Sequence, residues 1–170
     1  MRDRVLIVDD DAIIRASLRK VLEEENYAVV DCADGETAKV HSAREQIDLV
    51  LLDLNLSNEN GWNVFDELTR RDPFTPVIII TGMAHQLPTA RMAGAGAILE
   101  KPIEADALLK IMAELLAEPK EKALSRLSGY SNDTRHIPPS GKLSAKGEGK
   151  RAANFILGSD QESAGWGRRH

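Results

Sequence analysis

Four of five short apolar segments in the sequence end at residues that can hold a cation or a phosphoryl group. The first ends at Asp9 and Asp10, the third at Asp53 and the fourth at Thr81, and Lys101 closely follows the fifth. Three carboxylates packed together repel one another and raise each other's pKa, and one lysine balances only one of those charges. A hard divalent ion with oxygen ligands, most simply Mg²⁺, would complete the balance.

The same residue types support phosphoryl transfer. An aspartate carboxylate acts as a nucleophile toward a phosphoryl group and forms an aspartyl phosphate. A bound Mg²⁺ neutralises the transferring oxygens, while an ammonium and a hydroxyl bind the oxygens that remain. Each residue alone has a more ordinary explanation, since an aspartate after a strand is usually part of a turn or a helix cap. Their joint placement at strand ends favours a shared site.

The apolar segments alternate with segments of helical periodicity, which predicts five strand–helix units. Near-continuous apolar strands are typical of a parallel sheet covered by helices on both faces, and such sheets bind ligands at the carboxyl ends of their strands. Five units are too few for an eight-unit barrel, which leaves an open, doubly wound α/β sheet, either Rossmann-like or flavodoxin-like. Strands are expected at 4–8, 27–31, 47–53, 76–81 and 97–99, and helices at 12–25, 34–44, 61–71, 87–93 and 104–117.

Composition excludes several classes of protein. The chain is 42% hydrophobic and 29% charged, which is typical of a soluble globular protein. Its one cysteine, Cys32, excludes an internal disulfide and a multi-cysteine metal site. No apolar run is long enough to span a bilayer and the N-terminus does not resemble a signal peptide, so the expected compartment is the cytoplasm. Residues 1–117 carry 12 Lys and Arg against 21 Asp and Glu, which argues against non-specific nucleic-acid binding.

The composition changes after residue 117. Residues 118–170 contain 10 Lys and Arg against 6 Asp and Glu, with many Gly and Ser and few apolar side chains. A short helix over 120–128 is expected, whereas 131–151 has no apolar period and is typical of a disordered linker. We therefore expect 118–170 to be a largely disordered, mildly basic tail, and no DNA-binding domain is evident in it.

Four separated motifs resemble the receiver domain of two-component response regulators. The resemblance covers residues 3–117, and Gly61 follows Asp53 at the spacing found in that family's loop. It implies a flavodoxin-like fold, with a five-stranded parallel sheet in the strand order 2-1-3-4-5 and helices on both faces. The matching motifs are Val5–Asp11, Leu51–Asn55, Ile79–Gly82 and Glu100–Pro102.

The resemblance also implies roles for the residues at the strand ends. Asp53 would be the phosphoacceptor nucleophile, Thr81 the switch hydroxyl that contacts the phosphoryl group, and Lys101 a second phosphoryl contact. The phosphoryl group would come from a sensor histidine kinase or a histidine phosphotransfer protein. Such a domain is regulatory, catalyses only its own phosphorylation and dephosphorylation, and controls an unknown output partner by protein–protein contact.

The implied metal site uses oxygen ligands. Asp10 would bind Mg²⁺ directly and Asp9 would assist through water. Asp53 and the backbone carbonyl of Asn55 would complete the protein's share of the ligands.

Two positions depart from the family's pattern. Ser57 stands where the family often has proline, which is expected to loosen the loop, and Ile98 stands where an aromatic residue usually takes part in the switch.

Two alternative functions use some of the same residues. A haloacid-dehalogenase-like phosphatase would use Asp9–Asp11 and leave Asp53 without a role, and a degenerate receiver would act only as a binding platform.

Overall fold

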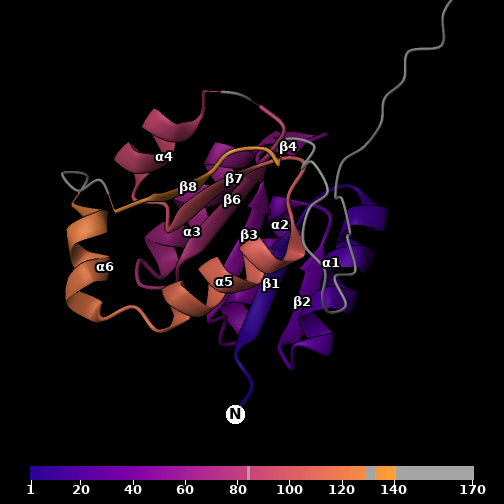
Figure 1. Cartoon of the computed structure of the whole chain (residues 1–170). Helices are drawn as coiled ribbons and strands as arrows, with labels where there is room; N and C mark the ends of the chain where they lie inside the picture. The colour runs from indigo at the N-terminus through magenta and orange to yellow at the C-terminus, as the bar shows by residue number, and fades with distance from the viewer. Residues whose placement is uncertain (84, 129–132, 141–170) are drawn as a thin grey trace, which may run out of the picture.

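The computed structural model describes residues 1–83, 85–128 and 133–140, in which strands and helices alternate along the chain (Figure 1). The strands are β1 (Arg4–Val8), β2 (Ala28–Cys32), β3 (Leu49–Asp53), β4 (Asn55–Leu56), β5 (Glu59–Asn60), β6 (Val77–Thr81), β7 (Ala97–Glu100) and β8 (Arg135–Ile137). The helices are α1 (Ala12–Glu24), α2 (Gly35–Arg44), α3 (Gly61–Arg71), α4 (Leu87–Ala93), α5 (Ala105–Leu116) and α6 (Lys120–Leu127).

The main sheet is parallel and has the order β2-β1-β3-β6-β7-β8. When β4 and β5 are set aside, its first five strands follow the expected order 2-1-3-4-5, so the flavodoxin-like fold is confirmed. Two differences concern short strands. The segment after Asp53, expected to be a loop, contains the small antiparallel hairpin β4–β5, and a sixth strand, β8, lies beside β7.

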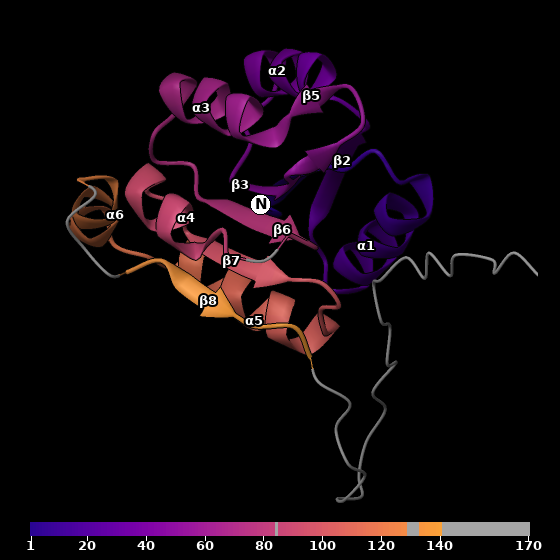
Figure 2. The same ribbon diagram turned by 90° about the horizontal axis from the view of Figure 1, so that it is seen from above.

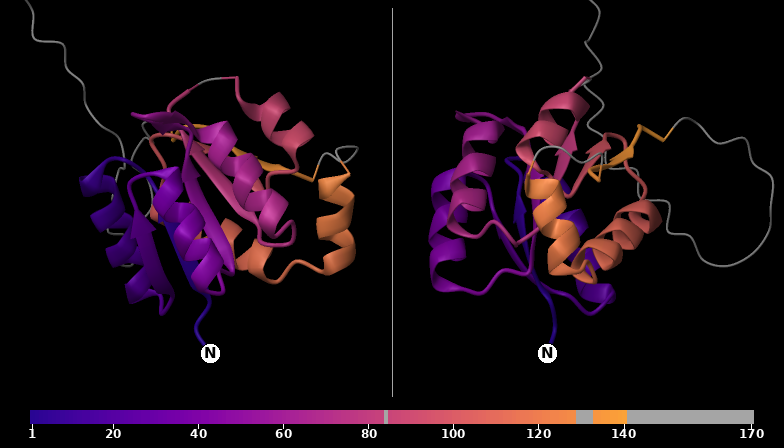
Figure 3. Two further views of the ribbon diagram at one scale, coloured as in Figure 1. Left: turned by 180° about the vertical axis from the view of Figure 1, so that it is seen from behind. Right: turned by 90° about the vertical axis from the view of Figure 1, so that its left-hand side faces the viewer.

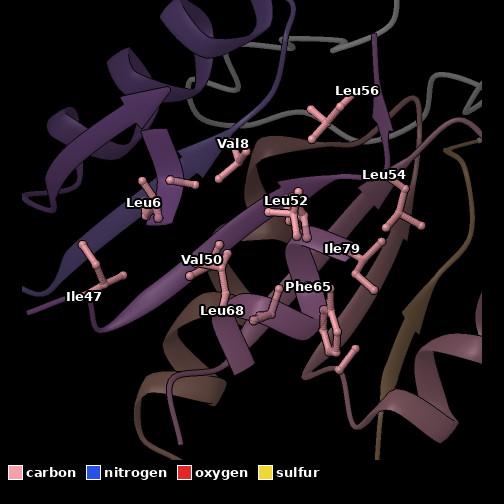
Figure 4. Close-up of a cluster of buried hydrophobic side chains, with 14 of the residues drawn as sticks. Leu6, Val8, Ile47, Val50, Leu52, Leu54, Leu56, Phe65, Leu68 and Ile79 are labelled. Carbon is pink, nitrogen blue, oxygen red and sulfur yellow. The ribbon is translucent and has the colours of Figure 1, made fainter. Parts of the chain in front are cut away.

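Helices cover both faces of the sheet (Figure 2). One buried cluster joins α1 and α5 to alternate residues of the strands, such as Ile7 and Leu51. The second joins α2, α3 and α4 to the intervening residues, and Figure 4 shows Phe65 and Leu68 of α3 among them. Because the strands are apolar on both faces, only their ends are free to carry polar groups to the surface.

Local signals in the sequence set the helix boundaries. The Asp11 carboxylate accepts hydrogen bonds from the backbone N–H groups of Ile13 and Ile14, so it caps α1. Pro88 lies in the first turn of α4, where its missing N–H costs nothing, and α4 ends at Gly94 with a φ of 78°. The short helix α4 therefore needs no irregularity to accommodate its proline.

The chain beyond α5 is part of the fold for a further stretch. A helix forms at Lys120–Leu127, where a short one was expected, and lies next to α4 (Figure 3). Residues 133–140, which the sequence assigns to a disordered linker, instead add β8 to the sheet. Apolar composition does not predict this strand, because β8 is held by backbone pairing with β7 and by the ion pairs of Arg135. The disorder that the sequence predicts for 141–170 concerns residues outside the described part of the chain.

Candidate phosphorylation and metal site

The carboxyl ends of β1, β3 and β6 bring three of the predicted residues to one edge of the sheet. Asp9 follows β1, while Asp53 and Thr81 are the last residues of β3 and β6. All three are buried, with exposed fractions of 2%, 4% and 0%. Polar side chains rarely have so little contact with water unless they have partners inside the protein.

Three carboxylates converge at this edge. Asp9, Asp10 and Asp53 each offer an oxygen atom, and these oxygens lie within 4.8 Å of one another. The sequence predicts this cluster from residues 44 positions apart, because strands β1 and β3 are adjacent and parallel. Oxygen donors at this spacing suit a hard divalent cation such as Mg²⁺, which binds through carboxylates and keeps several water ligands.

Lys101 supplies the positive charge nearest to the cluster. Its Nζ lies 2.8 Å from Oδ2 of Asp53 and 3.5 Å from Oδ2 of Asp9. Burial alone would lower the pKa of Lys101, but the hydrogen bond and charge of Asp53, together with Asp9, outweigh it and raise the pKa above its ordinary value. Lys101 is therefore a protonated hydrogen-bond donor at neutral pH.

One lysine does not offset three carboxylates. Burial raises the pKa of Asp9 to about 6, even though Lys101 and the backbone N–H of Asp11 act in the opposite direction. That N–H donates to Oδ1 of Asp9 at 2.8 Å. The site is thus short of positive charge in the protein alone, and its donor set fits a bound Mg²⁺.

Thr81 is linked to the site through its backbone. Its carbonyl accepts a hydrogen bond of 2.8 Å from the Lys101 N–H, and its Oγ1 accepts one of 3.0 Å from the N–H of Met83. The hydroxyl therefore lies at the start of the loop that leads to α4. Asn55 also contacts the nucleophile candidate, because its backbone N–H donates to Oδ1 of Asp53 at 2.9 Å.

Two contacts at the site are not predicted by the sequence. The Ser57 backbone N–H donates to Oδ2 of Asp10 at 3.0 Å and the Ser57 hydroxyl donates to the same oxygen. The Arg15 guanidinium donates to the backbone carbonyl of Asp9 at 2.6 Å. No motif marks either residue, and the only available signal was that Ser57 is polar where the family often has proline.

Comparison with known proteins identifies the family of the chain. The model of the response regulator receiver domain matches residues 5–113. The chain belongs to the response regulator receiver family. This membership favours the receiver over the phosphatase alternative and assigns a regulatory role in two-component signalling to the domain.

Among the receiver relatives, the chain is 33% identical over 116 residues to protein CcdB of Bacillus subtilis, covering 66% of this chain and 97% of that protein. It is 34% identical over 136 residues to the alginate biosynthesis regulator AlgB of Pseudomonas aeruginosa, covering 78% of this chain but 29% of the relative. The chain therefore spans nearly the whole of one relative and less than a third of the other.

Solved receiver structures show the same fold. A CheY-like receiver from Methanospirillum hungatei is 30% identical, with a TM-score of 0.67, and the match covers 72% of this chain and 99% of that one. TrrA of Thermotoga maritima, solved in complex with Mg²⁺ and BeF, is 27% identical with a TM-score of 0.62, over 66% of this chain and 98% of that one. Within the described part of this chain, no helix has the length and apolar character needed to cross a membrane.

Proposed function

We propose that this receiver accepts a phosphoryl group on Asp53 from a phosphohistidine of a sensor histidine kinase or a histidine phosphotransfer protein. The observation that carries the proposal is the hydrogen bond of 2.8 Å between Lys101 and Asp53, at an edge where Asp9 and Asp10 also converge. A buried carboxylate held by an ammonium and flanked by two further carboxylates fits a nucleophile in a cation-dependent phosphoryl transfer.

In this reaction an oxygen of Asp53 attacks the phosphorus atom. The new O–P bond forms as the N–P bond to the partner's imidazole breaks, and the imidazole leaves with the electron pair. The Lys101 ammonium stays protonated and donates to an oxygen of the incoming group, as it now donates to Asp53. The Asn55 N–H holds Oδ1 of Asp53, so the carboxylate is oriented before the partner arrives.

We assign the metal ligands from the same edge. Asp10 and Asp53 would hold Mg²⁺ directly, Asp9 would act through water, and the Asn55 carbonyl would complete the set. When bound, the ion supplies positive charge to the phosphoryl oxygens during transfer. The oxygen-only donor set and the deficit of positive charge support this assignment, as does the presence of Mg²⁺ in the TrrA complex.

Thr81 is the proposed switch. A phosphoryl group on Asp53 offers new acceptor oxygens near the end of β6, and the Thr81 hydroxyl turns toward them, moving the loop that carries Met83. Ile98 of β7 is 1% exposed and packs in the cluster of α2, α3 and α4. Because this side chain is already buried, the rearrangement is expected to be modest.

The proposed output is contact with a partner protein. Residues 118–170 show no DNA-binding domain in the sequence, although relatives such as AlgB are transcriptional regulators of which this chain spans only a part. The domain catalyses only its own phosphorylation and dephosphorylation. Transfer from the histidine kinase or phosphotransfer protein is proposed to take place in the cytoplasm.

The proposal is tested with acetyl phosphate and Mg²⁺, followed by intact-protein mass spectrometry. The parent gains one phosphoryl group that is lost on treatment with base, whereas Asp53→Asn gains none. Asp66→Asn, which changes an exposed carboxylate of α3, is the matched control and labels like the parent. Equal labelling of Asp53→Asn and the parent would show that Asp53 is not the acceptor.

A further inference from the structure

Ser57 makes two hydrogen bonds to a single oxygen of Asp10. Its backbone N–H lies 3.0 Å from Oδ2, and its hydroxyl donates to the same atom. Asp10 is one of the three carboxylates of the cluster, and Ser57 comes from the hairpin that follows Asp53. We propose that Ser57 is a positioning residue that holds the Asp10 carboxylate in place for Mg²⁺, an inference that rests on the metal site of the proposed function.

The hairpin that carries Ser57 is held in place by three backbone or side-chain contacts. Leu56 pairs with Glu59 across β4 and β5, which makes Ser57 a turn residue. The Glu59 carboxylate accepts a hydrogen bond from the Gly35 N–H at the start of α2. At the far end, the Gly61 N–H donates to the Leu54 carbonyl at 3.3 Å. The hairpin is thus anchored to the sheet and to α2, and the contact with Asp10 follows from this fixed path.

Close packing at Gly61 reinforces the anchor. A Cβ atom at this position would lie 2.4 Å from the Cα of Leu54, so only glycine allows the start of α3 to approach the end of β3. The close approach of the two ends of the hairpin is therefore set by backbone contacts.

The residue type at position 57 decides whether these bonds exist. Proline, which the family often has here, offers neither a backbone N–H nor a hydroxyl. Alanine would keep the N–H and lose the hydroxyl, and threonine would keep both. The sequence pattern alone suggests a looser loop at Ser57, whereas the structure shows that this residue adds two donors to a candidate metal ligand.

Two donors on one oxygen restrict the rotation of the carboxylate. Asp10 is only partly buried, so without them its side chain would sample several orientations in water. Hydrogen bonds to a metal ligand from outside typically change metal affinity by about 10–100-fold. Because Ser57 is exposed and water competes for its hydroxyl, the expected effect of the hydroxyl alone is at the low end, about tenfold.

The test is a Mg²⁺ titration of the full chain by isothermal calorimetry, with NMR chemical shifts as a second readout. Ser57→Ala is expected to weaken Mg²⁺ binding about tenfold, Ser57→Thr to match the parent, and Ser57→Pro to weaken binding at least as much as Ser57→Ala. Asn58→Ala, the neighbouring turn residue, is the matched control and keeps the parent's affinity. Thermal denaturation without Mg²⁺ confirms that each variant is folded.

Unchanged or tighter Mg²⁺ binding by Ser57→Ala would overturn the inference. Equal weakening by Ser57→Thr and Ser57→Ala would also overturn it, because the hydroxyl would then not be the group that matters. The titration needs no phosphoryl donor, so it is separate from the test of the proposed function. A parent that binds Mg²⁺ but takes no phosphate from acetyl phosphate would overturn the phosphoacceptor role of Asp53 alone, and the titration would still decide the role of Ser57.

Discussion

Lys101 and Asp53 form a largely buried ion pair across the carboxyl edge of the sheet, with 2.8 Å between Nζ and Oδ2. Their side chains are 16% and 4% exposed. A second carboxylate, that of Asp9, lies 3.5 Å from the same ammonium. In the metal-free protein Lys101 therefore occupies the position of a counter-ion for two carboxylates that water scarcely reaches. This arrangement has consequences for both stability and metal affinity.

Replacing Lys101 with methionine is expected to have opposite effects on these two properties. The metal-free variant should be about 1–3 kcal/mol less stable than the parent, because two buried carboxylates lose their partner. Mg²⁺ should bind the variant more tightly, because the competing ammonium is gone. Thermal denaturation over a range of Mg²⁺ concentrations measures both effects.

Lys110→Met is the control for Lys101→Met, since Lys110 is an exposed lysine of α5 away from the site. It should leave stability and Mg²⁺ affinity unchanged. Weaker Mg²⁺ binding by Lys101→Met would mean that the ammonium does not compete with the ion for the carboxylates.

The Thr81 hydroxyl is expected to affect the switch more than the final extent of phosphorylation. Thr81→Ala should accept phosphate from acetyl phosphate to the same extent as the parent, because Asp53 and its contacts are intact. The chemical-shift changes that follow phosphorylation in α4 and β7 should shrink, and Thr81→Ser should restore them. Two-dimensional NMR of the free and phosphorylated forms makes the comparison. Full-sized changes in Thr81→Ala would exclude this hydroxyl as the switch.

Arg126 of α6 anchors the C-terminal part of the fold. Its guanidinium lies 2.8 Å from Oε2 of Glu118, with both side chains 3% exposed, and donates to the Gly94 carbonyl at 2.6 Å. Arg126→Met should lower the free energy of unfolding by about 3 kcal/mol, because it leaves a buried carboxylate short of a partner. Denaturant unfolding measures this loss.

Lys122→Met tests whether that loss reflects burial. Lys122 lies on the same helix but is exposed, so its replacement should change stability by less than about 0.5 kcal/mol. Similar losses for the two variants would show that the buried ion pair contributes no more than an exposed lysine.

Asp31 of β2 should make stability depend on pH in the acid range. Burial opposes ionisation of this carboxyl, but hydrogen bonds and charges from Arg19 and Arg15 outweigh it and lower its pKa. A group with a lowered pKa contributes its full stability above its unfolded pKa of about 3.9. This contribution disappears as the pH falls through the folded pKa.

Asp31→Asn should therefore be about 1 kcal/mol less stable than the parent at pH 7. The gap should narrow as the pH falls below the unfolded value of about 3.9 and close below the folded pKa, as measured by urea unfolding at several pH values. A gap that stays constant from about pH 7 to about pH 2.5 would contradict this origin.

The long strands and the converging site residues were predictable because their signals are local. A run such as Leu49–Leu52 is apolar on both faces and ends in an acid, which marks a buried parallel strand and the position of its end. Once such strands are known to be parallel, Asp9 and Asp53 must lie at the same edge. Their separation in the sequence does not change this placement.

The strand β8 was not predictable in the same way. Ile137 is its one apolar residue, and what holds it is the edge of β7, a partner almost forty residues earlier in the chain. Thr134 donates its hydroxyl to the Ala95 carbonyl, and Arg135 pairs with Glu114 at 3.0 Å. Polar contacts of this kind leave no periodic pattern in the sequence. The same holds for Ser57, whose importance depends on a hairpin two residues long on each side.

The position of β8 at the end of the sheet also bears on how the protein is made. Synthesis proceeds from the N-terminus, so β1 to β7 leave the ribosome before residues 133–140 do, and the sheet can form with the far edge of β7 open. An unpaired edge is a template for pairing with other chains. For the nascent protein, the interval between the emergence of β7 and that of β8 is the period of greatest exposure to misassembly. Slowed translation after Glu100 would lengthen that interval.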